Sequence, residues 1–169
     1  LAWCWVFATF LSRETLAEIL KNETIENMPY TADIEIDLTT RTTGNYIISS
    51  QHRRTGNPNK SIWTINFDEE VECFINAMNG NWKTEAIAWG IKTIGDVLHV
   101  VGLNPDNEEL KIAKFVDGSK TNVWHGYPAD YMRKAQDRPE TVILKTWVDN
   151  GYITKAKMSK IRLGQSCNL

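Results

Sequence analysis

Hydrophobic positions follow a helical period most clearly in the segment 68–80, DEEVECFINAMNG. Asp68 is the expected N-cap, and Asn79-Gly80 is the expected stop. The apolar residues recur at the i, i+3, i+4, i+7 spacing of a helix with one buried face, namely Val71, Phe74, Ile75 and Met78. The pattern predicts a helix that packs this face on a sheet.

A period of two marks the segment 31–38, TADIEIDL. Successive side chains of a strand point to opposite faces, so the alternation predicts a half-buried strand with an acidic solvent face. The apolar positions are Ile34, Ile36 and Leu38, and the acidic positions are Asp33, Glu35 and Asp37. Three carboxylates spaced roughly 6.5 to 7 Å apart on a rigid strand cannot all ligate one metal ion. We interpret the acidic face as a surface for a partner.

Further strand-like segments follow along the chain. The segments 45–51 and 61–67 are predicted to be strands joined by a long hairpin loop, the polar and turn-rich residues 52–60. Strand composition also characterises 86–94, 96–103 and 110–116, although the first of these could be helical. A short amphipathic helix is predicted near residues 14–22.

The last third of the chain has a different character. Residues 122–139, NVWHGYPADYMRKAQDRP, combine aromatic, acidic and basic side chains around a glycine and two prolines, which favours an ordered connector that also binds. A helix is predicted over 139–150, with Pro139 at its start and Gly151 just past its end. A basic helix is predicted over 154–164, between a Thr154 cap and Gly164.

Together these elements predict an α+β fold. We expect an antiparallel sheet of about five or six strands, with helices packed on one face and a basic two-helix C-terminal subdomain. A chain of 169 residues is most simply one domain. Within it, residues 1–118 are expected to form an acidic α+β core and residues 119–169 the basic helical C-terminal subdomain.

Composition narrows the class of protein. Hydrophobic residues make up 42% and charged residues 24%, values typical of soluble globular proteins. The uncharged first eleven residues are fewer than the roughly 20 apolar residues that span a bilayer, so we expect a buried element and no membrane contact. Three cysteines without CxxC or Cys/His spacing predict reduced thiols in a cytoplasmic protein, with no metal and no cofactor.

Charge is unevenly distributed, although the formal net charge is only −2. Residues 119–169 contain nine Lys and Arg against four acids, so residues 1–118 carry the excess of acids. Such asymmetry indicates an electrostatic partner. The expected binding residues are therefore the acids Asp33, Glu35 and Asp37, and in the 122–139 stretch Trp124, Tyr127, Arg133, Lys134 and Arg138.

Two histidines lie in segments suited to acid–base chemistry. His52 precedes Arg53 and Arg54, and His125 lies within the 122–139 stretch. If the two rings converge, one histidine could take a proton and the other give one while the arginines stabilise a phosphorane. A solvated loop tip and a surface or capping histidine are the alternatives.

The predicted basic helix carries four cations suited to phosphate contacts, Lys155, Lys157, Lys160 and Arg162. A helix-turn-helix is disfavoured by the sequence. With Gly151 as the turn glycine, Trp147 falls where the motif needs a small residue, and Lys157 and Lys160 fall where it needs apolar ones.

Two functional hypotheses follow from these observations. The first is a non-catalytic binding protein, such as an inhibitor or immunity-type partner whose acidic face masks a basic toxin or nuclease. The second is a nucleic-acid-binding protein or a metal-independent phosphodiesterase or ribonuclease that uses His52 and His125. The hypotheses predict opposite partners, a basic protein in the first case and a polyanion in the second.

Overall fold

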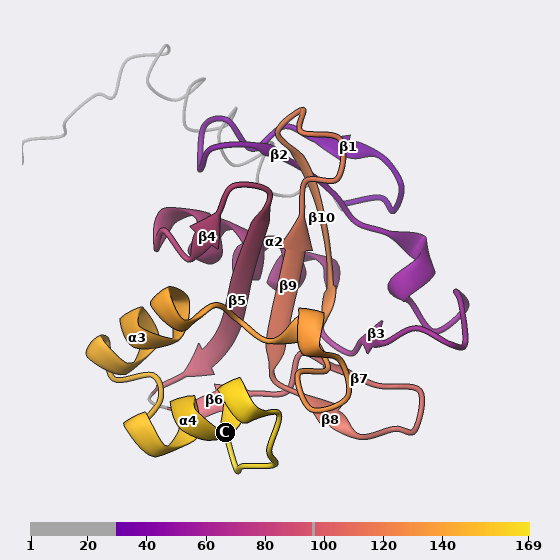
Figure 1. Cartoon of the computed structure of the whole chain (residues 1–169). Helices are drawn as coiled ribbons and strands as arrows, with labels where there is room; N and C mark the ends of the chain where they lie inside the picture. Colours follow the sequence, from indigo (N-terminus) through magenta and orange to yellow (C-terminus); the bar gives the residue numbers. More distant parts are fainter. Residues whose placement is uncertain (1–29, 96) are drawn as a thin grey trace, which may run out of the picture. The chain divides into compact units, whose positions relative to one another are not determined.

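The computed structural model describes residues 30–95 and 97–169, and residues 31–169 form one compact unit. The fold is α+β, as predicted, with a mostly antiparallel sheet and a two-helix C-terminal region (Figure 1). The helix predicted near 14–22 and the uncharged first eleven residues lie outside the described residues.

The described part of the chain builds a seven-stranded sheet in the order β1-β2-β10-β9-β5-β4, with β6 paired to β5. Its strands are β1 (Glu35–Ile36), β2 (Asn45–Ile47), β4 (Lys83–Thr84), β5 (Ile87–Ile94), β6 (Val97–His99), β9 (Ile112–Val116) and β10 (Val123–Pro128). Strands β2 and β10 pair in parallel, and the other described pairs of this sheet are antiparallel. A smaller sheet contains β3 (Ile62–Trp63), β7 (Gly102–Leu103) and β8 (Glu109–Leu110).

Helix α2 (Phe67–Asn79) packs one face on the large sheet. The four apolar residues predicted to face the core are buried, which confirms the helical period. The predicted N-cap was wrong, because Asn66 caps the helix in place of Asp68. The Asn66 side chain accepts from the Glu69 amide, and the Glu69 carboxylate accepts from the Asn66 amide. This reciprocal capping box satisfies two amides that a helix start leaves unpaired.

Aromatic side chains fill the space between α2 and the sheet. Phe74 stacks on Tyr46 with ring centroids 4.7 Å apart and meets the edge of Phe115 at 5.4 Å. Gly126 lies opposite Phe115 in the sheet. A Cβ at this glycine would come within 2.6 Å of the Tyr46 hydroxyl oxygen. The aromatic rings can therefore pack close to β10 only because position 126 has no side chain.

The C-terminal region consists of a 3-10 turn, η2 (Ala135–Asp137), and the helices α3 (Thr141–Asp149) and α4 (Lys155–Leu163). The predicted caps of α4 are confirmed, since the Thr154 hydroxyl accepts from the Lys157 amide and Gly164 has a left-handed backbone. Helix α2 covers one face of the large sheet, as expected. Helices α3 and α4 lie on the other side of the sheet (Figure 1).

The strand predicted over 31–38 is mostly absent from the structure. Only Glu35–Ile36 of the segment 31–38 is a strand, and Ile34 is 58% exposed rather than buried. Asp33 has a left-handed φ of 61°, and its side chain accepts from the Ser50 amide, which turns the chain just before β1. The alternation of residue types therefore reflects a turn and a short edge strand.

The hairpin predicted from residues 45–51 and 61–67 is not formed. Strand β2 pairs with β1 and β10, while β3 belongs to the smaller sheet, so the two strands do not form a hairpin. The segment between them forms a 3-10 turn, η1 (Ser50–His52), whose last residue is buried. This turn lies between β2 of the large sheet and β3 of the smaller sheet.

The 122–139 stretch, predicted to be a connector, begins with a strand of the large sheet. Its first residues form β10, which lies between β2 and β9 inside the large sheet. Trp124 and Gly126 face α2, and the residues that alternate with them, His125 and Tyr127, face the opposite side. The glycine and the prolines of the stretch suggested a turn, but the sheet accepts Gly126 because large rings cover it.

Candidate functional site

His52 and His125 line one pocket of about 270 Å³, although they are far apart in the sequence. His52 ends the η1 turn, and His125 lies in β10 on the sheet face opposite α2. The other lining residues are Asp33, Ile47, Ser49, Gln51, Lys60, Val123 and Trp124. The structure thus brings together the two histidines that the sequence suggested, and adds a lysine.

His52 is held in a defined orientation. It is 7% exposed, and its Nδ1 lies 2.8 Å from the Ser61 carbonyl oxygen. A carbonyl oxygen can only accept, so Nδ1 carries the proton and Nε2 of the neutral ring carries a lone pair. The imidazole also stacks on Tyr127, with ring centroids 5.2 Å apart and an interplanar angle of 17°. These contacts leave Nε2 as the nitrogen that can act as a base.

Both histidines have a lowered pKa. For His52 the main cause is desolvation by burial, opposed by the Ser61 hydrogen bond and reinforced by the nearby Lys60. For His125 desolvation is again the main cause, followed by Lys60. Each ring is therefore neutral at a pH near 7, and each imidazolium is a stronger acid than an exposed one.

Lys60 and Asp33 are the charged groups of the pocket. The Lys60 ammonium donates to the Gln51 side-chain oxygen at 2.5 Å. Hydrogen bonds from Ser50 lower the pKa of the Asp33 carboxyl, so it is ionised at neutral pH. Lys60 is the cation of this pocket suited to an anionic ligand group, since a lysine ammonium binds phosphate as a point charge.

A buried polar network supports the pocket from behind. The Tyr127 hydroxyl donates to Asp137 at 2.9 Å, and the same carboxylate lies 3.7 Å from the Lys114 ammonium. The Asp130 amide also donates to Asp137. Burial and the neighbouring Asp137 raise the pKa of Tyr127, so its phenol stays protonated. The network fixes the ring on which His52 stacks.

The structure places the two arginines of the predicted catalytic set differently. Arg53 forms an ion pair with the fully buried Glu70, donates to the Ile65 carbonyl at 3.0 Å and stacks over Phe67. These contacts commit its guanidinium to the core. Arg54 is exposed, and neither arginine lines the histidine pocket.

The predicted acidic binding residues are all exposed, and each accepts a hydrogen bond from another residue of the chain. Asp33 accepts from the Ser50 amide, Glu35 from the Asn45 side chain, and Asp37 from the Thr39 amide and hydroxyl. They lie on or beside β1, an outer strand of the described sheet. Of the three, only Asp33 lines the histidine pocket.

The binding residues predicted in the 122–139 stretch have varied surroundings. Trp124 is 3% exposed and packs against Phe74, so most of its surface belongs to the core. Arg133 forms ion pairs with Asp106 and Glu108. The remaining cations are Arg138, whose Nε donates to the Tyr131 carbonyl, and the exposed Lys134, whose charge lowers the pKa of His52.

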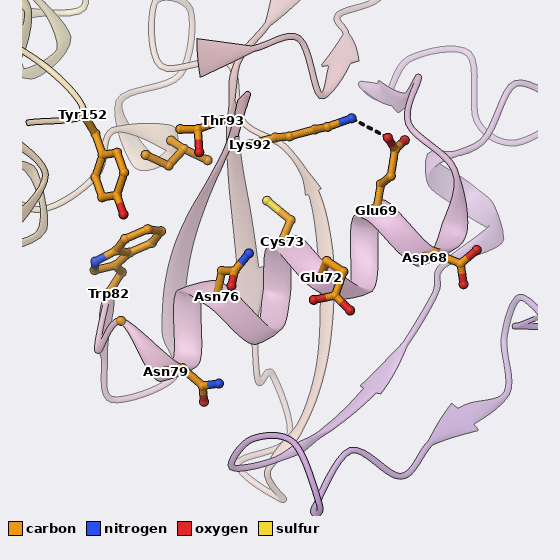
Figure 2. Close-up of a pocket in the computed structure, with 12 residues that line it drawn as sticks. Asp68, Glu69, Glu72, Cys73, Asn76, Asn79, Trp82, Lys92, Thr93 and Tyr152 are labelled. Atoms are coloured by element: carbon orange, nitrogen blue, oxygen red, sulfur yellow. Dashed lines mark hydrogen bonds and ion pairs between the residues drawn. The ribbon is translucent and has the colours of Figure 1, made fainter. Parts of the chain in front are cut away.

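A second and larger cavity, of about 640 Å³, runs along α2 (Figure 2). Trp82 and Tyr152 form one end, where their rings meet edge to face at 5.5 Å. Glu69 and Lys92 form the other end and pair with each other. Cys73 lies between, and burial raises the pKa of its thiol to about 12, which keeps it protonated and unreactive. The cavity has a size suited to small molecules, but it lacks an activated nucleophile or base among the residues described.

Several residues in the histidine pocket and in the polar network behind it carry no signal in the sequence. Lys60 ends a polar loop without a periodic pattern, and Asp137 and Lys114 meet only through pairing of distant segments. The alternation of side chains along a strand was the one signal that could have indicated this site, because it places His125 and Tyr127 on the same face of β10.

Within the described residues, no group of three or more His, Cys, Asp or Glu side chains is arranged to hold a metal ion, and no helix is long and apolar enough to cross a membrane. No protein-family model, curated protein or solved structure matches the chain.

Proposed function

We propose that the chain is a metal-independent phosphodiesterase that cleaves single-stranded RNA, with His52 and His125 as its acid–base pair. The observation that carries this proposal is the shared pocket, which both histidines line together with Lys60. Two imidazoles and an ammonium supply a base, an acid and a phosphate-binding cation, the groups that such a cleavage requires.

The proposed reaction is an internal transfer at phosphorus. His52 Nε2 takes the proton of the ribose 2′-hydroxyl, and the 2′-oxygen attacks the adjacent phosphorus. The bond between phosphorus and the 5′-oxygen breaks, and the His125 imidazolium gives its proton to the leaving 5′-oxygen. The products are a 2′,3′-cyclic phosphate and a 5′-hydroxyl, and Lys60 stabilises the charge on the non-bridging oxygens.

The pKa shifts determine the pH dependence. Activity needs a neutral His52 and a protonated His125, so the rate is greatest between the two pKa values. Desolvation lowers both pKa values below 6.5. We therefore expect a maximum on the acidic side of pH 6.5 and a fall in activity as the pH rises above it.

The test is cleavage of a fluorophore-labelled RNA oligonucleotide in the presence of EDTA. His125→Ala should reduce kcat/KM by roughly 10² to 10⁴-fold, the usual contribution of a general acid or base. His52→Asn removes the base while an amide can still donate to the Ser61 carbonyl. His99→Ala is the matched control, because His99 lies in β6 and does not line the pocket. Absence of cleavage by the wild type at any pH from acidic to neutral, or full activity of His125→Ala, would overturn the proposal.

A second candidate is the non-catalytic binder of a basic protein, such as an inhibitor or immunity-type protein. The observation in its favour is the exposure of Asp33, Glu35 and Asp37 at an edge of the sheet, since rim charges govern encounter and specificity. This function and the expected cytoplasmic location stay predictions.

A further inference from the structure

Helix α4 presents one continuous face to solvent. Successive residues of a helix are 100° apart, so Ala156, Ser159 and Leu163 share one direction. All three are exposed, and Leu163 is 65% exposed although it is a large apolar residue. The opposite side of the helix is anchored by Ile161, which is fully buried. The centre of the exposed face therefore consists of two small residues and one leucine that has no apolar cover from the described residues.

Cations border this face on both sides. The same helical geometry places Lys155 and Arg162 along one border and Lys160 along the other. All three are exposed, and their side chains make no ion pair or hydrogen bond with the described residues. Helix α4 contains no acidic residue. By contrast, Arg133 and Arg53 are neutralised by acids.

The helix is held firmly enough to present this face. Its first turn is capped by Thr154, and Gly164 ends it with a φ of 68°. The guanidinium of Arg138 packs against Gly164 where a side chain would otherwise lie. Trp147 of α3 is fully buried, and α3 packs on α4. A docking partner would thus meet a preformed surface.

From this geometry we infer that α4 docks in the major groove of duplex DNA. A helix with short side chains is about 10 to 12 Å across, and the major groove of B-form DNA is about 12 Å wide. The basic borders then lie along the two phosphate backbones, while the small residues allow close approach to the base edges. Leu163 is placed to contact a thymine methyl group. The histidine pocket takes no part in this docking.

Docking in the groove requires only the exposed face of α4 and not the helix-turn-helix spacing that the sequence disfavours. Trp147 is accommodated in the core against Trp82, at a ring separation of 5.8 Å. Lys157 is half-buried beside the anchored side, and Lys160 is exposed on a border of the docking face. Double-stranded RNA is the wrong partner, because the major groove of an A-form helix is too narrow for a helix to enter.

The experiment measures binding of the full chain to a short labelled DNA duplex by fluorescence anisotropy over a series of salt concentrations. The variant Lys155→Glu/Arg162→Glu removes two phosphate contacts. We expect the slope of log K against log[salt] to become shallower by about 2, and the affinity at about 0.1 M salt to fall roughly 50-fold. The charge-matched control is Arg54→Glu/Lys120→Glu, two exposed cations outside α4. The control should bind nearly as the wild type does.

Two further measurements separate groove docking from general attraction to polyanions. An RNA duplex of the same length should bind at least tenfold more weakly than the DNA duplex, because only phosphate contacts remain to it. Leu163→Asp should weaken DNA binding while circular dichroism stays unchanged. Equal weakening of both double variants, equal affinity for the two duplexes, or absence of DNA binding by the wild type would each overturn the inference.

Discussion

The buried ion pair between Arg53 and Glu70 links helix α2 to the turn that carries His52. Glu70 is fully buried, accepts from the Arg53 guanidinium, and also accepts from the Tyr46 hydroxyl at 2.7 Å. Glu70→Leu would leave a guanidinium that is 16% exposed without its counter-charge. Removal of one partner of a buried pair costs about 3 to 5 kcal/mol. We expect this loss in the free energy of unfolding.

A double-mutant cycle tests the reasoning. Arg53→Met should cost a similar amount, because it leaves the Glu70 carboxylate buried and unpaired. The double variant removes both charges, and its loss should be much smaller than the sum of the single losses, since apolar replacement of a buried pair is often neutral or stabilising. Urea unfolding at neutral pH, followed by tryptophan fluorescence, measures all four proteins. Additive losses would refute the coupling.

The exposed pair Arg41–Glu72 provides the control for this cycle. Its side chains are 44% and 49% exposed, so solvent screens their attraction. The coupling energy of an exposed pair is about 0 to 1 kcal/mol. A coupling of this size for Arg53–Glu70 as well would mean that burial does not strengthen the pair.

Three other outcomes follow from the structure. Phe74→Ala should lower the free energy of unfolding by about 3 to 5 kcal/mol, because Phe74 is fully buried, and a loss below about 1 kcal/mol in urea melts would contradict its packing. Stability should fall as the pH drops below 6.5, because burial lowers the pKa of folded His52 and the unfolded chain binds protons first. His52→Asn should flatten that slope in melts over a pH series, and an unchanged slope would assign it to other groups. A triple change to Lys at Asp33, Glu35 and Asp37 should leave the melting temperature within a few degrees but abolish capture of basic proteins, and unchanged capture would remove the support for an acidic binding face.

Local sequence patterns predicted the features that depend on residues close together in the chain. The helical period of Val71, Phe74 and Met78 identified the buried face of α2, and Thr154 and Gly164 marked the ends of α4. These features depend on residues within one or two turns of each other. Asp68 failed as a cap because Asn66 completes a reciprocal pair with Glu69, and two hydrogen bonds stabilise a helix start more than one.

Features that depend on distant segments were not predictable in the same way. The sequence singled out His52 and His125, but their shared pocket follows from the parallel pairing of β2 with β10 and the 3-10 turn after β2. Lys60 enters the same pocket without a sequence signal. Arg53 appeared suited to catalysis beside His52, yet its guanidinium is held by Glu70 of helix α2. Charge type was visible in the sequence, whereas the partner of each charge was not.

The position of β10 between β2 and β9 also governs how the chain reaches its native state. Strand β10 comes after every other described strand, but it fills a central place in the sheet. During synthesis, the edges of β2 and β9 that pair with β10 therefore lack their hydrogen-bond partner until the ribosome has released the residues up to Pro128. Contacts between such distant segments form slowly, because a long loop must close before they stabilise anything. A nascent chain paused before β10 would expose two unpaired strand edges, and pairing of those edges with another copy is the failure that this topology invites.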